Sequence, residues 1–210
     1  MLPSKEVIRV LERAYPCAGF EDACRTMQWD LQSGFIPRGY IGATNTVSDV
    51  EVVFVLSEPG EPQGDENYSS EMSAIELIKM TCRQTYVCLM DQRDQYHSNL
   101  RFILDQFFPS VDLDLQLKRC WITQSVLCSA PVETGILPVE VSRECRVQYL
   151  ERQLQLFPNA RVVALGSAAQ SRLRAYASLL VAGHPAPPGC NHRGVREGWV
   201  SIARQFRGAF

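Results

Sequence analysis

The sequence lacks any uninterrupted apolar run of about 18 residues, which is the length that a membrane-spanning helix needs. Its first 15 residues mix apolar side chains with charges of both signs, and they lack the apolar core of a signal peptide. We therefore expect a cytoplasmic protein that does not enter a membrane.

The chain also lacks an excess of charge of either sign. Its 21 lysine and arginine residues nearly balance 23 aspartate and glutamate residues, which gives a net charge of −2. This balance argues neither for nor against a nucleic acid partner, because a nearly neutral protein can still carry a local basic patch. One such stretch is residues 191–210, which contain four arginines and one glutamate.

Internal repeats, low-complexity tracts and linkers are absent as well. A chain of 210 residues is long enough to bury one large core, so we expect a single domain over residues 1–210. Within it, residues 1–45 would form an N-terminal helix and a cysteine-bearing segment packed on the rest. A monomer is the simplest expectation.

What the chain does contain is an alternation of short apolar runs and longer amphipathic segments. The runs are rich in β-branched residues and bounded by turn formers, as strands covered on both faces are, and they span 50–56, 120–127, 160–166 and 178–183. Segments with apolar residues at three-to-four spacing predict helices over 4–14, 70–90, 95–107, 139–156, 167–177 and 195–206. This order predicts an α/β fold, a three-layer α/β/α sandwich around a central, mainly parallel four-stranded sheet.

Sites in such sheets form beyond the carboxyl ends of the strands, and the sequence places a carboxylate and a histidine there. Glu58 follows the first strand, and the Pro59–Gly60 turn after it is stiff yet open to close approach. His184 follows the fourth strand, and three nearby prolines would hold it in place, ready to donate to a developing negative charge. A solvated acidic loop and a histidine satisfied by local backbone are the alternatives.

Eight cysteines are a large number for a cytoplasmic chain. Disulfides are disfavoured in that compartment, so ligation of a metal or cluster is the main alternative to plain burial. Cys82, Cys88 and Cys120 lie in apolar helical or strand-like runs and are expected to be inert core thiols.

Four segments, in order and at plausible spacing, resemble motifs of the uracil-DNA glycosylase superfamily, nearest its iron–sulfur-containing members. The segments are VVFVLSEPGEPQGDENY (52–68), CWITQSVLCSAP (120–131), ARVVALGSAA (160–169) and GHPAP (183–187). The first is similar to a strand ending in a Pro-Gly turn, and the last to the family's His-Pro-Ser-Pro motif. The resemblance covers about residues 50–205 and implies a DNA glycosylase.

The resemblance also implies a cofactor. Cys128 and Cys145 resemble one pair of cluster ligands in the iron–sulfur glycosylases, and Cys17 and Cys24 lie where the other pair is found. Four thiolates suit a [4Fe–4S] cluster with a structural role; zinc in a four-cysteine site or free thiols are the alternatives. The chain departs from the family in having six residues between Cys17 and Cys24, where the family usually has two.

A glycosylase flips a nucleotide out of the DNA into a pocket before it cleaves the N-glycosidic bond. By resemblance, Glu58 stands where an acid positions the attacking water, with Asp65 and Glu66 as rival candidates. His184 would donate a hydrogen bond to the carbonyl oxygen of the departing pyrimidine.

Further residues are assigned to the base pocket and to DNA by the same resemblance. Gln124 matches the asparagine that reads the base edge, Tyr68 the aromatic residue that stacks on the base, and Asp65 would lie in the same pocket. Residues that would grip the backbone or enter the duplex are Pro59, Ser167, Pro185, Asn191, His192 and Arg193.

The target base stays open between uracil and a modified or damaged pyrimidine. Glutamine at position 124 can present either its donor or its acceptor to a base. Gly60 stands where some members carry a tyrosine that excludes a substituent on pyrimidine C5, although Glu61 offers another block. A C5-modified pyrimidine in phage DNA, with a role in defence, is one alternative. A catalytically inactive DNA-binding iron–sulfur protein of the same fold is the other.

Overall fold

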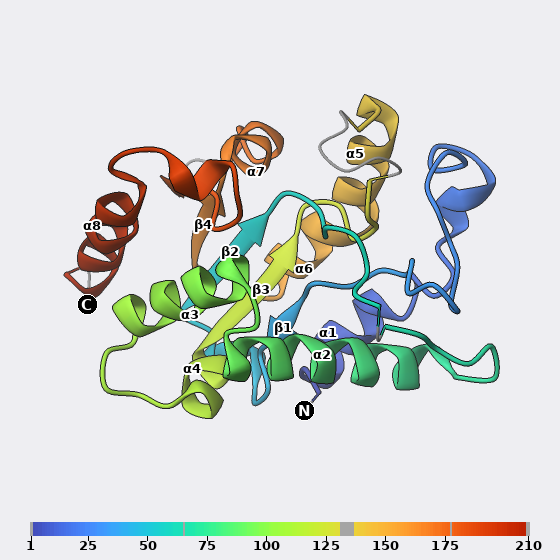
Figure 1. Ribbon diagram of the computed structural model, residues 1–210, viewed down its shortest axis with the longest axis horizontal. Coiled ribbons are helices and arrows are strands. Elements are labelled where there is room, and N and C mark those ends of the chain that lie inside the picture. Colours follow the sequence, from blue (N-terminus) through green and yellow to red (C-terminus); the bar gives the residue numbers. More distant parts are fainter. Residues whose placement is uncertain (1, 65, 131–136, 177, 209–210) are drawn as a thin grey trace.

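The computed structural model describes residues 2–64, 66–130, 137–176 and 178–208 (Figure 1). The strands are β1 (Ile41–Gly42), β2 (Val52–Leu56), β3 (Cys120–Gln124), β4 (Arg161–Leu165) and β5 (Leu179–Ala182). The helices are α1 (Lys5–Leu11), α2 (Ala74–Asp91), α3 (Gln95–Phe107), α4 (Leu113–Arg119), α5 (Val139–Cys145), α6 (Glu151–Gln155), α7 (Ser167–Arg172) and α8 (Val195–Arg207). Among the described residues, no helix is both long and apolar enough to cross a membrane.

The sheet has the order β1-β3-β2-β4-β5, and β2, β3, β4 and β5 pair in parallel. The α/β class and the four parallel strands are confirmed. The prediction of a four-stranded sheet is wrong, because β1 adds a fifth strand that runs antiparallel to β3 and makes the sheet mixed. With two residues, β1 is too short to leave a periodic pattern in the sequence.

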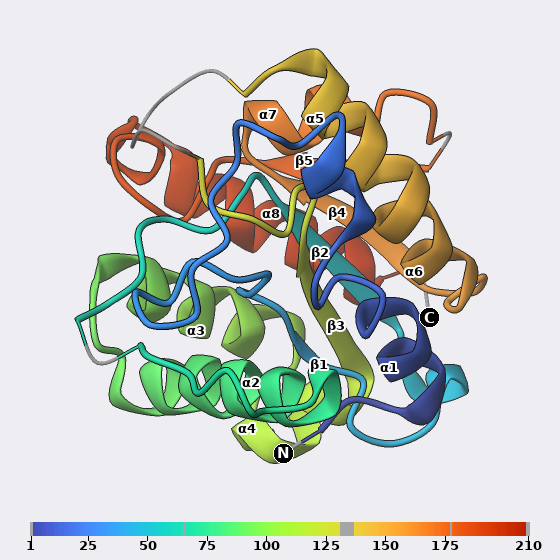
Figure 2. The same ribbon diagram turned by 90° about the vertical axis from the view of Figure 1, so that its right-hand side faces the viewer.

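Helices cover both faces of the sheet (Figures 1 and 2). Along β2, Val52, Phe54 and Leu56 belong to one core cluster and Val53 and Val55 to the other. The first cluster includes residues of α3, α4 and α8, and the second includes residues of α1, α6 and α7. All five residues of β2 are fully buried, as a continuous apolar run predicts for a strand covered on both sides.

One helix was not expected from the sequence. Leu113, Leu115 and Leu117 alternate with polar residues, which is a strand-like period, yet they form α4. The Asp112 carboxylate accepts a hydrogen bond from the Leu115 backbone N–H at 2.8 Å and caps the helix. Leu115 is 46% exposed while Leu113 and Leu117 are buried, so the local cap and packing, not the period, decide the conformation.

The expected helix over 139–156 forms as α5 and α6 joined by a π-helical turn at Arg146–Leu150. The helix expected over 167–177 ends earlier, at Arg172. The side chain of Arg172 reaches back to the sheet edge, where it donates to the Ser57 carbonyl at 2.9 Å. A helix end is therefore fixed close to the polar loop that follows β2.

Replacing Gly42 with alanine is expected to destabilise the protein by at least about 2 kcal/mol. Gly42 has a φ of +113°, and an added Cβ would lie 2.3 Å from the Cys120 carbonyl oxygen. Urea unfolding would measure the change. Gly198→Ala is the matched control, because its Cβ would meet open space within α8, and it is expected to raise stability by up to about 1 kcal/mol. Equal effects of the two substitutions would contradict the prediction.

Candidate functional site

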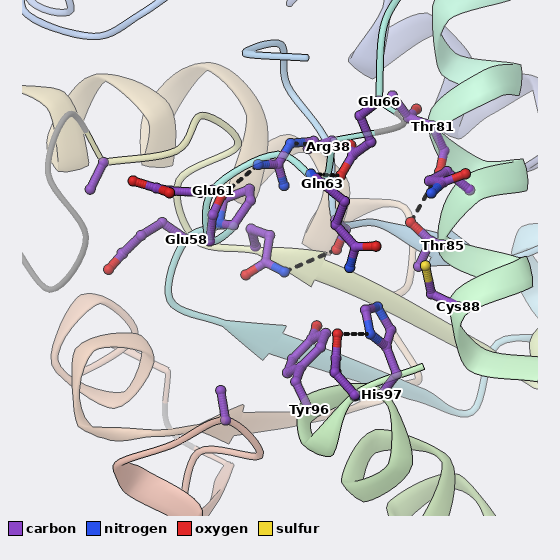
Figure 3. A pocket seen from close by; sticks show the side chains of 18 of the residues that line it. Arg38, Glu58, Glu61, Gln63, Glu66, Thr81, Thr85, Cys88, Tyr96 and His97 are labelled. Atoms are coloured by element: carbon purple, nitrogen blue, oxygen red, sulfur yellow. Dashed lines mark hydrogen bonds and ion pairs between the residues drawn. The ribbon is translucent and has the colours of Figure 1, made fainter. Parts of the chain in front are cut away.

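A cavity of about 470 Å³ lies beyond the carboxyl ends of the parallel strands (Figure 3). It is lined by Glu58, Pro59 and Gly60 after β2, Gln124 at the end of β3, and His184 after β5. The sequence predicted that these residues would meet at one sheet edge, and the structure brings them together. The volume falls within the range usual for small-molecule and cofactor pockets, about 300–1,000 Å³.

The loop around His184 is held from two sides. Trp199 of α8 donates its indole N–H to the Gly183 carbonyl at 2.8 Å, and Asn99 of α3 donates to the Pro185 carbonyl at 2.8 Å. Gly166 packs directly against the imidazole, and a Cβ there would lie 3.0 Å from the His184 ring. The imidazole therefore has little freedom to move.

The protonation state of His184 is fixed by the same loop. The Ala186 backbone N–H donates to Nδ1 at 3.1 Å, so Nδ1 acts as an acceptor and the proton of the neutral ring is on Nε2. Burial lowers the pKa of His184 below its usual value. At neutral pH the ring is uncharged, with an Nε2–H donor that lies 3.4 Å from the Ser57 hydroxyl.

Gln124 ends β3 directly beside the last residue of β2. Its Nε2 donates to the Gly39 carbonyl at 3.0 Å. Its Oε1 is buried and has no partner that meets hydrogen-bond geometry among the described residues, and the side-chain amide also contacts the Tyr96 hydroxyl. A buried acceptor without a donor costs free energy, so a ligand that presents an N–H here would relieve it.

Two acids that the sequence offered for water activation, Glu58 and Glu66, lie in the described part of the loop after β2. Each of them is paired with an arginine. Glu58 Oε2 lies 2.6 Å from Arg172 Nη1, and Glu66 Oε2 lies 3.5 Å from Arg38 Nε. Both acids line the cavity with His184. The remaining candidate, Asp65, lies outside the described residues.

The aromatic wall of the cavity differs from the sequence prediction. Tyr68, expected to stack on a base, is 7% exposed and packs in the core cluster on the α1 face of the sheet, away from the cavity lining. Tyr96 of α3 lines the cavity instead, and its ring stacks on that of His184 with centroids 6.4 Å apart and planes 24° apart. Among the described residues, Tyr96 and not Tyr68 is therefore the tyrosine at the cavity.

A second histidine faces the cavity beside Tyr96. The Asp94 carboxylate accepts the His97 backbone N–H through Oδ1 and contacts His97 Nδ1 through Oδ2, both at 2.8 Å. Asp94 is the N-cap of α3, so one carboxylate fixes both the helix start and the imidazole. Figure 3 shows His97 and Tyr96 on the side of the cavity opposite Glu58 and Glu61.

The residues expected to contact DNA are placed at the cavity and around it. Pro59 lines the cavity, while Pro185 is buried. The others are exposed: Ser167 at the start of α7, and Asn191, His192 and Arg193 just before α8.

The four cysteines assigned to a cluster surround a second, smaller cavity. Cys17, Cys24, Cys128 and Cys145 all line it, together with Tyr149. Burial, together with the charge of neighbouring thiolates, raises the pKa of Cys145 to about 12 and that of Cys24 to about 11. The four cysteines that the resemblance assigns to a cluster therefore line one cavity.

Donors point at two of these sulfurs. The Gly19 N–H lies 3.3 Å from Cys17 Sγ, the Tyr149 hydroxyl lies 3.0 Å from the same sulfur, and the Leu127 N–H lies 3.3 Å from Cys145 Sγ. Hydrogen bonds to sulfur are a feature of cluster-ligating thiolates, so the donor set fits an iron–sulfur cluster. In the described part of the chain, no three cysteine, histidine or acidic side chains stand in metal-ligating geometry.

Sequence reasoning missed Arg38, Tyr96 and the Asp94–His97 pair. Arg38 precedes β1 in a stretch without periodicity, and its guanidinium reaches the Gly60 carbonyl and the Ser129 hydroxyl only through the fold. The Asp94–His97 pair did leave a signal in the sequence. Asp94 stands just before a predicted helix, where aspartate is a good cap, and three residues later comes His97, one of only three histidines.

Comparison of the chain with protein-family models finds no match, and comparison with curated proteins finds no relative either.

Proposed function

We propose that the protein is a DNA glycosylase that takes a flipped pyrimidine into the cavity and hydrolyses its N-glycosidic bond. One observation carries the proposal. A neutral imidazole, with its Nε2–H set by the Ala186 N–H, shares a cavity with a buried amide acceptor, Gln124 Oε1. These are the groups needed to stabilise a departing base anion and to bind an N–H of the base edge.

The departing pyrimidine carries negative charge, which is spread onto its carbonyl oxygens. A donor that is already in place and shielded from water stabilises that charge without reorganisation. The His184 loop is braced by Trp199 and Asn99, so the donor is held before the base enters. Tyr96, stacked beside His184, offers an aromatic surface to the extruded ring.

The same proposal assigns a [4Fe–4S] cluster to Cys17, Cys24, Cys128 and Cys145. When bound, the cluster would supply a structural crosslink between the N-terminal segment and the loop after β3. The chain's own residues already bring the thiols to one cavity.

Release of free base from synthetic DNA tests the proposal. Single strands and duplexes carrying uracil, 5-hydroxymethyluracil or 5-hydroxymethylcytosine would be incubated with excess protein, then treated with alkali to cleave abasic sites. We expect strand cleavage with at least one of these pyrimidines. Binding without release from any of them would instead support an inactive DNA-binding protein of this fold.

Gly60→Tyr tests the room available for a substituent on the base. An added Cβ at Gly60 meets no atom within 4 Å, so a tyrosine side chain can extend into the cavity that Gly60 lines. We expect release of 5-hydroxymethyluracil to fall at least about tenfold relative to uracil, the size of effect a steric block produces in a pocket. Parallel rates on the two duplexes would measure it, and an equal loss on both would contradict the assignment. Gly64→Tyr, whose added Cβ is equally unobstructed but which does not line the cavity, is the control.

A further inference from the structure

The proposed glycosylase needs a group that accepts a proton from the attacking water. The two described acids of the β2 loop identified above as candidates are ill suited to this task, because Arg172 and Arg38 hold them in ion pairs. In each pair the guanidinium of the arginine occupies the Oε2 atom of the carboxylate. We therefore expect the general base to be another residue that lines the cavity.

The Asp94–His97 pair has the required arrangement. Asp94 Oδ2 lies 2.8 Å from His97 Nδ1, so in the neutral ring Nδ1 carries the proton and Nε2 keeps its lone pair. The side chain of His97 is 12% exposed, and both residues line the cavity with His184. This is the opposite tautomer to that of His184, whose Nδ1 accepts from Ala186.

We propose that His97 is the general base of the reaction and that Asp94 is its positioning residue, an inference that rests on the proposed function. The water oxygen attacks C1′ of the flipped nucleotide as the bond from C1′ to N1 breaks. The bonding electron pair leaves with the base, whose carbonyl oxygen accepts a hydrogen bond from His184 Nε2–H. The water proton passes to His97 Nε2, and Asp94 stabilises the imidazolium that forms.

The two imidazoles then have different roles because they are different tautomers. His184 presents a donor to the leaving group and His97 presents an acceptor to the nucleophile, and Tyr96 contacts both rings, lying 4.8 Å from His97 by ring centroids. Among the described residues that line the cavity, Glu61 is the remaining acidic rival. It is exposed at the rim and extends away from His97 (Figure 3).

Single-turnover release with enzyme in excess tests the inference on uracil and 5-hydroxymethyluracil duplexes. His97→Ala is expected to lower the rate at least about 10²-fold, the usual contribution of a general base. Binding of the same duplexes and the melting temperature should stay unchanged, and added imidazole should restore part of the rate. Asp94→Asn keeps a good helix cap but removes the carboxylate, and is expected to lower the rate at least about tenfold with binding unchanged.

The outcomes separate this inference from the function on which it rests. Wild-type rates in His97→Ala would overturn it while leaving the glycosylase proposal intact. Loss of rate in Glu61→Gln with His97→Ala unaffected would transfer the role to Glu61 and likewise overturn it. A wild-type protein that releases no base from any duplex would overturn both. A loss in His97→Ala that is explained by weaker binding or a lower melting temperature, without imidazole rescue, would also count against it.

Discussion

Replacing His184 with alanine is expected to lower the rate of base release at least about 10²-fold, because it removes the donor that we propose stabilises the departing base anion. The prediction depends on the neutral ring: the Ala186 N–H on Nδ1 leaves Nε2–H as the donor, and burial keeps the pKa of His184 low. Single-turnover rates on a uracil duplex would measure the loss.

His184→Gln is the matched comparison for His184→Ala. Its amide is neutral and retains an N–H donor at roughly the same reach, so part of the rate should return. The Ala186 N–H would lose its acceptor in both variants, which separates the leaving-group contribution from loop integrity. If alanine and glutamine gave the same rate as wild type, with binding unchanged, His184 would not contact the leaving group.

The parts of the site that the sequence predicted share one physical origin. Glu58, Gln124 and His184 each follow a run of apolar residues, and parallel pairing of buried strands brings their carboxyl ends to one edge. The runs were visible because strands covered on both faces need nearly continuous apolar sequence. Convergence of these three residues therefore required no knowledge of side-chain contacts.

The parts that escaped prediction depend on contacts between distant segments. Arg38 takes its place only when the segment before β1 packs beside the β2 loop. There it contacts the Gly60 carbonyl and forms an ion pair with Glu66. Tyr96 and Tyr68 are both tyrosines near polar loops, and only the packing of α3 against the His184 loop decides which ring reaches the cavity. The period-two leucines of α4 show the same limit, since a capping carboxylate outweighed the pattern.

The cysteine assignment leads to the second large effect. Cys145→Ser is expected to abolish cluster binding and to lower the free energy of unfolding by several kcal/mol, because metal-binding free energy is folding free energy where a site links separate segments. Cys145 is buried, and its sulfur accepts the Leu127 N–H at 3.3 Å. Iron and acid-labile sulfide per chain, visible absorption of the purified protein and urea unfolding would measure the effect.

Cys190→Ser is the matched control for this experiment, because Cys190 is partly exposed and lies outside the four-thiol cavity. It should keep the iron, the colour and the stability of the wild type. A colourless wild-type protein that contains zinc would contradict the cluster while keeping a four-cysteine site. Wild-type protein free of both metals, with stability unaffected by Cys145→Ser, would show that the four cysteines are buried thiols.

The spacing of Cys17 and Cys24 makes Cys17→Ser a further test of the cluster. Gly19 packs between these two sulfurs, where an added Cβ would lie 3.2 Å from Cys24 Sγ and 3.3 Å from Cys17 Sγ. The six intervening residues therefore turn both thiols toward one point, and loss of iron in Cys17→Ser is the expected result.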